Sequence, residues 1–260
     1  MPSLGVTSWS FRRDSMNDVS RETPSVPETA RRVFLIDRLP LAEAYADLLA
    51  TAGVERGLIG PREAPRLWDR HLLNCAVLGD LLPQGATVAD IGSGAGLPGL
   101  VLAIHRPDLR MTLIEPLLRR TTFLDEVVDR LALTNVEVVR GRADAVHGER
   151  TFDVVTSRAV APLARLLEWS MPLVAPHGAL VAMKGSSIAD EIGEARRVLA
   201  KLGCAEPEIS LLGEGLLDST TLAVRVAWAD PAKVSLASMP GSAARRPGAK
   251  NARSKRRKKT

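Results

Sequence analysis

The amino-acid sequence predicts one doubly wound α/β domain with a mostly parallel sheet, preceded by a short helical cap. Two observations predict this fold. From residue 86 onward, short β-rich runs alternate with helical stretches, which is typical of β-α-β units. The glycine-dense segment DIGSGAGLPG (residues 90–99) follows the first of these runs and precedes an apolar helical stretch. A loop in that position lies at the carboxyl ends of the strands, where such sheets bind their ligands.

Two helical stretches precede the alternating region. The first spans LPLAEAYADLLATAG (residues 39–53), with Pro40 in its first turn and Gly53 placed to end it. Its apolar face consists of Leu41, Ala44, Tyr45, Leu48 and Leu49. The second follows Pro65 and carries one stripe that consists of Leu67, Trp68, His71, Leu72 and Cys75. We interpret His71 on this stripe as a packed residue and not as a ligand.

Six strands are expected in the remaining chain. They are TVADI (87–91), MTLIE (111–115), VEVVRG (136–141), FDVVTS (152–157), ALVAMKG (179–185) and TLAVRVAW (221–228). Helical stretches at 117–133 and 188–203 lie between them. We therefore divide the chain into a disordered N-terminal extension (1–30), a helical cap (31–85), a ligand-binding α/β domain (86–230) and a disordered basic tail (231–260).

The composition is that of a globular protein without a membrane anchor. Hydrophobic residues make up 45% of the 260 residues and charged residues 25%. No apolar run approaches the roughly 20 residues that a membrane span needs, and the N-terminus lacks the apolar core of a secretory signal. Cys75 and Cys204 stand far apart without a C-x-x-C spacing, which favours reduced thiols in the cytoplasm over a disulfide or a metal site.

The charge is divided between an acidic body and a basic tail. Of the 35 Lys and Arg residues, nine lie in RRPGAKNARSKRRKKT (residues 245–260), which holds no acid. The other 244 residues carry 26 basic and 30 acidic side chains, a net charge of −4. Blocks of like charge repel one another and often bind polyanions. We predict that the tail contacts nucleic-acid phosphates; the alternative is a solubilising tail without a specific partner.

The glycine-dense loop allows a ligand to approach the backbone closely. Gly92, Gly94 and Gly96 suit a tight turn against a ligand, and Pro98 suits the first turn of the next helix. Gly94, Gly96 and Gly99 also satisfy the G-x-G-x-x-G pattern of dinucleotide sites, so the glycines alone do not identify the ligand. A purely structural turn needs only one or two glycines, so we expect this loop, Gly92 and Gly94 included, to border a cofactor.

Acidic residues near the ends of the first three strands help to discriminate between ligands. Asp90 at the base of the loop would repel a pyrophosphate and attract a cation; the alternative is a strand-end residue that caps the turn. S-adenosylmethionine carries an ammonium and a sulfonium beside a nucleoside and therefore fits an acid-first loop. Glu115 suits hydrogen bonds to ribose hydroxyls, as in dinucleotide enzymes. Asp144 in GRAD (141–144), with nearby backbone groups, suits the amino edge of an adenine.

The order and spacing of these motifs resemble the Rossmann-like class I S-adenosylmethionine-dependent methyltransferases. Three further stretches narrow the resemblance: LWDRHLLN (67–74), GAGLPG in the loop (94–99), and SRAVAPL (157–163) followed by AMKG (182–185). Together they resemble the RsmG (GidB) family, which methylates N7 of a guanine in the decoding-region loop of bacterial 16S ribosomal RNA. The resemblance covers residues 35 to 228. It implies a seven-stranded sheet, S-adenosylmethionine as cofactor, and 16S rRNA or the 30S subunit as partner.

The resemblance also implies roles for individual residues. Gly92 and Leu97 would contact the cofactor from the loop, and Ala143 and Asp144 would hold the adenine edge. Arg158 would lie beside the cofactor and face the incoming RNA. The alternative for Arg158 is a surface arginine at the end of a strand, but it ends an apolar run at the ligand-binding edge, which favours a functional role.

The absence of two motifs found in other methyltransferases is consistent with guanine N7 as the methyl acceptor. Methylation of an exocyclic amine usually goes with an N/D-P-P-Y/F motif, and C5 methylation of a pyrimidine needs a cysteine nucleophile, commonly after proline; neither pattern occurs. N7 presents an in-plane lone pair, so direct attack on the methyl group requires no general base, and we assign none. Arg158 and Lys184 are the candidates for positioning the RNA, with catalysis coming from approach, alignment and desolvation.

The sequence departs from the family before the last strand, where members often place a basic residue and this chain has Ser219 to Thr221. Two other readings stay open: a methyltransferase for another RNA, a small molecule or a protein, and a noncatalytic RNA-binding protein of the same fold. An NAD-dependent oxidoreductase is disfavoured by Asp90 and by the lack of a Tyr-x-x-x-Lys motif. Nothing indicates an obligate interface, so we expect a monomer.

Overall fold

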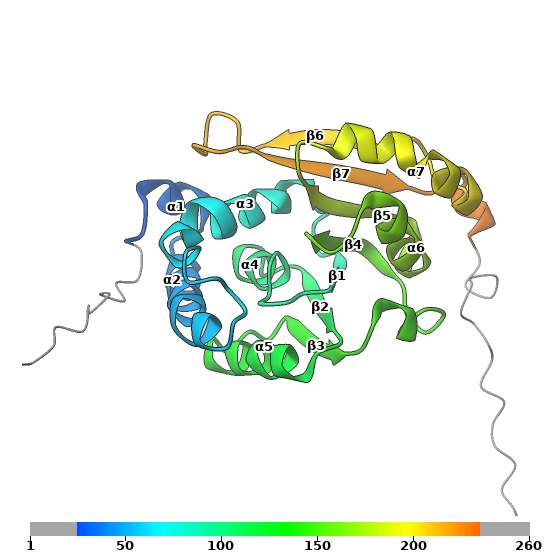
Figure 1. The fold of residues 1–260 in the computed structure, drawn as a ribbon. Coiled ribbons are helices and arrows are strands. Elements are labelled where there is room, and N and C mark those ends of the chain that lie inside the picture. The colour runs from blue at the N-terminus through cyan, green and yellow to red at the C-terminus, as the bar shows by residue number, and fades with distance from the viewer. Residues whose placement is uncertain (1–24, 235–260) are drawn as a thin grey trace, which may run out of the picture.

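The computed structural model describes residues 25–234, which form one seven-stranded sheet with helices on both faces (Figure 1). The strands are β1 (Thr87–Ile91), β2 (Arg110–Glu115), β3 (Val136–Arg140), β4 (Phe152–Arg158), β5 (Val174–Lys184), β6 (Glu208–Leu212) and β7 (Thr221–Ala227). The helices are α1 (Glu28–Val33), α2 (Leu39–Leu48), α3 (Leu73–Ala76), α4 (Gly99–His105), α5 (Leu118–Arg130), α6 (Leu163–Ser170) and α7 (Ile188–Leu202). The predictions for residues 1–24 and 235–260, the basic tail among them, lie outside the described residues.

The sheet has the strand order β3-β2-β1-β4-β5-β7-β6. The first five strands in this order run parallel, and β7 pairs antiparallel with both β5 and β6. The chain winds outward from β1 to β3 and then returns to β4 beside β1, so the order reverses between β1 and β4. Open α/β sheets bind ligands at the carboxyl ends of the strands beside such a reversal. The predicted doubly wound, mostly parallel sheet is confirmed.

The strand β6 has no counterpart among the six strands expected from the β-rich runs. It is an edge strand that pairs only with β7 among the described strands, and Ile209 and Leu211 on it remain exposed. A strand without a buried face lacks the clear apolar pattern by which strands are recognised in a sequence.

The strands alternate their side chains between two apolar layers. Val88 and Val154 pack on the face covered by the cap, α4 and α5, whereas their neighbours Ala89 and Val155 pack under α6 and α7. This alternation follows from the two-residue period of a strand. Both faces of the sheet are therefore buried, as parallel sheets require. None of the helices between residues 25 and 234 is both long and apolar enough to cross a membrane.

The helical cap differs from its prediction in two details. The helix that begins with α2 does not end at Gly53, because residues 54 and 55 continue it after the π-helical segment Leu49–Gly53; the chain turns at Gly57, whose φ is +64°. The buried face of α2 and this continuation consists of Leu39, Ala42, Tyr45, Ala46, Leu49 and Gly53, so only Tyr45 and Leu49 of the predicted face are fully buried. In addition, α1 starts at Glu28, inside the segment expected to be disordered.

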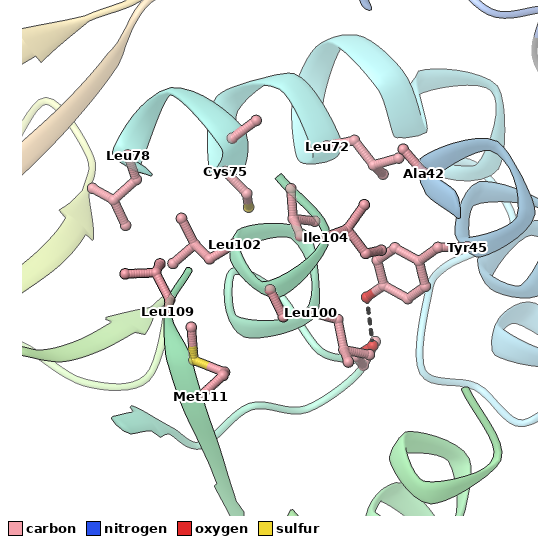
Figure 2. Packing of buried hydrophobic residues seen from close by; sticks show 14 of the residues in the cluster. Ala42, Tyr45, Leu72, Cys75, Leu78, Leu100, Leu102, Ile104, Leu109 and Met111 are labelled. Atoms are coloured by element: carbon pink, nitrogen blue, oxygen red, sulfur yellow. Dashed lines mark hydrogen bonds between the residues drawn. The ribbon is translucent and has the colours of Figure 1, made fainter. Parts of the chain in front are cut away.

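The cap packs directly on the buried apolar side chains of α4, as Figure 2 shows. Tyr45 of α2, together with Leu72 and Cys75 of the second helical stretch, shares one cluster with Leu102 and Ile104 of α4, and all five are fully buried. Burying a large apolar side chain stabilises a fold by about 1.5 to 3 kcal/mol. The cap is therefore held by the same core that supports the glycine-dense loop.

Candidate functional site

The glycine-dense loop follows β1 and reverses the chain with three glycines in the left-handed region. The φ angles are +68° at Gly92, +60° at Gly94 and +100° at Gly96. The amide N–H of Gly96 donates to the carbonyl of Ser93 at 2.7 Å, which closes a tight turn. Residues that carry a side chain rarely adopt these φ angles, so this turn favours glycine at all three positions. The predicted cofactor loop is therefore a tight, glycine-lined turn at the carboxyl end of β1.

Asp90 lies in β1 at the base of this loop. Its side chain is 0% exposed, and Oδ2 accepts a hydrogen bond from the amide N–H of Gly99 at 3.0 Å, at the start of α4. The other carboxylate oxygen, Oδ1, is buried and has no hydrogen-bond partner among the described residues, so the attraction of a cofactor cation to Asp90 stays a prediction. The alternative, a strand-end residue that caps the following turn, describes its position. Burial also raises the pKa of Asp90 to about 7, which weakens its negative charge near neutral pH.

The raised pKa of Asp90 predicts a specific pH dependence of stability. Between about pH 4 and 7 the folded protein keeps a proton on Asp90 that the unfolded chain releases, so rising pH favours unfolding. Asp90→Asn removes this titration and retains an oxygen that accepts from Gly99. We expect the free energy of unfolding of the wild type to fall by about 2 to 4 kcal/mol relative to Asp90→Asn across this range. Urea titrations at several pH values measure this difference, and a difference that rises with pH would contradict it.

Glu115 ends β2 and ties the loop to the neighbouring strand. Its side chain is 1% exposed; Oε2 accepts from the amide N–H of Gly94 at 3.0 Å, and Oε1 accepts from the amide N–H of Leu117 at 3.1 Å. Arg120 donates to the same Oε2 at 3.4 Å. This carboxylate thus lies against the loop where a ribose is expected, already engaged with donors from both sides.

A first cavity of about 220 Å³ lies beside the loop, at the ends of β1, β2 and β3. It is lined by Ile91, Gly92, Pro116, Arg142, Ala143, Asp144, Val160 and Trp169. The lining is mainly apolar, with Asp144 at one side, and the Asp144 carboxylate accepts from Arg142 Nε at 3.2 Å. An apolar slot with one acidic edge suits a purine ring that carries an amino group. The site brings together Gly92, Ala143 and Asp144, as predicted.

A second, larger cavity of about 600 Å³ opens at the ends of β4 and β5. Arg70 and Asn74 of the cap, Arg158 of β4 and Lys184 of β5 border it. Val160 lines both cavities, so they adjoin at this side chain. Asn74 and Ser157, which also border the larger cavity, each have a buried side-chain oxygen without a hydrogen-bond partner among the described residues.

Arg158 connects the end of β4 to the cap. Its Nη2 donates to the carbonyl of Arg70 at 3.1 Å, and its Nη1 donates to Cys75 Sγ at 3.4 Å. Burial raises the pKa of the Cys75 thiol to about 11, so this thiol stays protonated and is no nucleophile at neutral pH. The guanidinium is thereby fixed at the wall of the larger cavity, on the ligand-binding edge where the sequence predicts it.

Lys184 borders the same cavity but is already paired. Its Nζ lies 2.7 Å from Glu191 Oε2 and donates to the carbonyl of Ala161 at 2.9 Å. Burial opposes the ionisation of Glu191, but hydrogen bonds from Lys184, the amide of Leu163 and Ser187 outweigh it and lower the Glu191 pKa. Lys184 therefore fixes the turn after β4, and its charge is shared with Glu191.

Leu97 and Gly94, two of the predicted residues, line neither cavity, and some residues that do line the cavities were not singled out in the sequence. Leu97 packs against the cap-side core, and Gly94 donates to Glu115; neither borders the two cavities. Trp169 on α6 belongs to no motif, and Val160 lies within SRAVAPL but was given no role of its own; both line the smaller cavity. Thr221, from the segment without the expected basic residue, borders the larger cavity with a hydroxyl-bearing side chain.

The sheet order, the glycine turn at its reversal and the apolar slot beside that turn are features of an α/β protein that binds a nucleoside cofactor, and the family to which the chain belongs gives the class. The protein is a Rossmann-like class I methyltransferase, and S-adenosylmethionine is its cofactor. Within that class the chain belongs to the GidB family, rRNA small subunit methyltransferase G, whose profile matches residues 38–218.

Known proteins agree with this assignment. A protein of a Nocardioides species named ribosomal RNA small subunit methyltransferase G is 68% identical over 219 residues, which cover 84% of this chain and 88% of that protein. A protein of the same name from Thermobifida fusca is 50% identical over 232 residues, covering 89% and 98% of the two chains. A solved SAM-dependent methyltransferase from Aquifex aeolicus shares the fold, with a TM-score of 0.50 and 20% identity over 66% of this chain and 97% of that one.

Proposed function

We propose that the chain transfers a methyl group to N7 of a guanine in 16S rRNA of the small ribosomal subunit. The observation that carries this proposal is the protonation chemistry of the larger cavity. The ionisable side chains on its lining are Arg70, Arg158, Lys184 and Glu191. The first three are cations, and the Glu191 carboxylate is held by three donors. The described residues leave no free base in this cavity, which suits a nucleophile that has no proton to lose, and guanine N7 is such a nucleophile.

The residues around the smaller cavity fit the nucleoside part of the cofactor. Ala143 and Asp144 would hold the adenine edge, Trp169 offers an aromatic face, and Glu115 lies where the ribose hydroxyls are expected. When bound, S-adenosylmethionine supplies a methyl group on a positively charged sulfur. Val160, where the two cavities adjoin, and Gly92 beside it in the smaller cavity would then border the path from donor to acceptor.

The acceptor base enters the larger cavity in this proposal. Asn74 and Ser157 offer oxygens that lack partners, and guanine presents both donors and acceptors on its edge. Arg158 and Arg70 place positive charge where RNA phosphates approach. Catalysis comes from holding N7 in line with the methyl group and from excluding water. The partner is the 30S subunit or its 16S rRNA, the basic tail adds phosphate contacts, and the enzyme works as a monomer in the cytoplasm, where ribosomes assemble.

Methyl transfer followed by chemical cleavage tests this function. Small subunits that lack the modification are incubated with labelled S-adenosylmethionine and then treated with borohydride and aniline, which cleave RNA at N7-methylguanine. We expect label in 16S rRNA and a single cut in the decoding region. Label without a cut would contradict the N7 assignment, and label only in a small molecule or a protein would favour the other methyltransferase class. Heat-denatured enzyme is the control.

A further inference from the structure

We propose that Tyr45 of the helical cap is a positioning residue for the cofactor, because it fixes the conformation of the glycine-dense loop. This inference rests on the placement of the cofactor over that loop. Figure 2 shows the Tyr45 ring beside Leu100, with its hydroxyl directed at the loop and not at another cap residue. Tyr45 is 50 residues away from its partner in the sequence, so the contact joins two separate parts of the chain.

The contact itself is short and fully buried. The Tyr45 hydroxyl donates to the carbonyl of Ala95 at 2.7 Å, and the Tyr45 side chain is 0% exposed. Burial raises the pKa of the phenol well above its ordinary value, so the hydroxyl keeps its proton and remains a donor. The Ala95 carbonyl is the acceptor in the middle of the loop, between Gly94 and Gly96.

The two flanking glycines make this hydrogen bond important for the shape of the loop. Glycine populates positive and negative φ with similar ease, so the peptide group between Ala95 and Gly96 has little intrinsic preference for its orientation. Without the Tyr45 hydroxyl, the Ala95 carbonyl is a buried acceptor with no partner. Rotation of that peptide group relieves the loss, but it also displaces the Gly96 N–H from Ser93 and changes the surface of the loop. The loop then spends less time in the conformation that binds.

A second contact between the cap and the site also supports a positioning role for the cap. Arg158, on the other side of the site, donates to the carbonyl of Arg70 and to Cys75 Sγ in the cap. Tyr45 on the cofactor side and Arg70 with Cys75 on the acceptor side thus connect both halves of the proposed site to the helical cap. This arrangement explains why a cap outside the sheet lies in the same core as α4.

Tyr45→Phe tests the proposal, since it removes the hydroxyl and keeps the ring in the core. If the fraction of molecules whose loop has the binding conformation falls to one tenth, the apparent affinity for the cofactor falls tenfold. We expect the Kd for S-adenosylhomocysteine, measured by calorimetry well below the unfolding temperature, to rise by about tenfold in Tyr45→Phe, or about 1.4 kcal/mol. The KM for S-adenosylmethionine rises similarly, whereas kcat at saturating cofactor stays within about twofold, because the bound loop has its native shape.

Two further variants separate this role from a loss of stability. Leu72→Val removes one buried methylene-sized group from the same cluster without touching the loop, and we expect it to lower the unfolding temperature with an unchanged Kd. Trp169→Ala removes the aromatic wall of the smaller cavity and reports on the cofactor placement itself. If Trp169→Ala weakens binding and Tyr45→Phe does not, the role of Tyr45 is overturned alone. If neither weakens binding, the cofactor placement fails and this inference fails with it.

Discussion

Replacing Arg158 with alanine is expected to lower kcat/KM for methyl transfer to small ribosomal subunits by about 100-fold, because a small misplacement at a reacting centre costs that much. The guanidinium forms part of the wall of the larger cavity and holds the carbonyl of Arg70 and the thiol of Cys75. Its removal takes positive charge from the acceptor side and releases the cap from β4. We expect the larger part of the loss in transfer to RNA and a smaller part in cofactor affinity.

Two companion variants make this result interpretable. Arg158→Lys keeps the charge but loses the planar fork that reaches both partners, so we expect an intermediate rate. Arg225→Ala removes an arginine of β7 that is paired with Glu208 at 3.4 Å, away from both cavities, and full activity is expected there. Labelled-methyl kinetics under identical salt conditions measure all three. An Arg158→Ala enzyme with wild-type kcat/KM would remove this residue from the acceptor site.

Gly96→Ala is expected to destabilise the fold by about 3 to 4 kcal/mol and to abolish cofactor binding at micromolar concentrations. The φ of Gly96 is +100°, which an alanine adopts only under strain. A Cβ there would also overlap the fully buried side chain of Leu100 and stand 2.8 Å from the Tyr45 hydroxyl. Both neighbours lie in the packed core, so neither can move aside cheaply.

Gly94→Ala is the matched control for stability. Its φ is +60°, but the nearest atom to an added Cβ is the carbonyl oxygen of Gly92 at 3.8 Å, an ordinary contact. Only the left-handed backbone then opposes the substitution, at a cost of about 1 to 2 kcal/mol. Urea unfolding of both variants separates backbone strain from steric overlap. Equal losses in the two variants would show that the packing of Leu100 and Tyr45 against the loop is unimportant.

The fold was largely predictable because most of its strands have a buried apolar pattern. The runs at 87–91 and 111–115 lie in the sheet as expected, and the glycines at 92, 94 and 96 take the left-handed conformations for which they were singled out. The exceptions have physical causes. The edge strand β6 has no buried face to produce a pattern, and Gly53 is itself buried inside a helix that continues through residues 54 and 55.

The site was predictable where it is built from backbone and strand ends, and less so where it depends on packing. The residues Gly92, Ala143 and Asp144 border one cavity because parallel strands end at the same edge. By contrast, sequence alone does not reveal that Asp90 turns inward to Gly99, or that Lys184 is neutralised by a glutamate on the following helix. The sequence predicted S-adenosylmethionine as the cofactor, and this prediction is confirmed. The prediction relied on the Asp90 carboxylate, which in the structure accepts a hydrogen bond from the amide of Gly99.

The single side chain of Val160 stands between the two cavities, and its neighbour Ala159 has a φ of +53°, a conformation unusual for alanine. An added Cβ on Gly92 would stand 3.0 Å from Val160 Cγ2, so the partition presses closely on the glycine turn. In the proposed function, the methyl donor and the acceptor base would thus be separated by the thickness of one valine. Their alignment would then depend on a four-residue turn that joins β4 to α6.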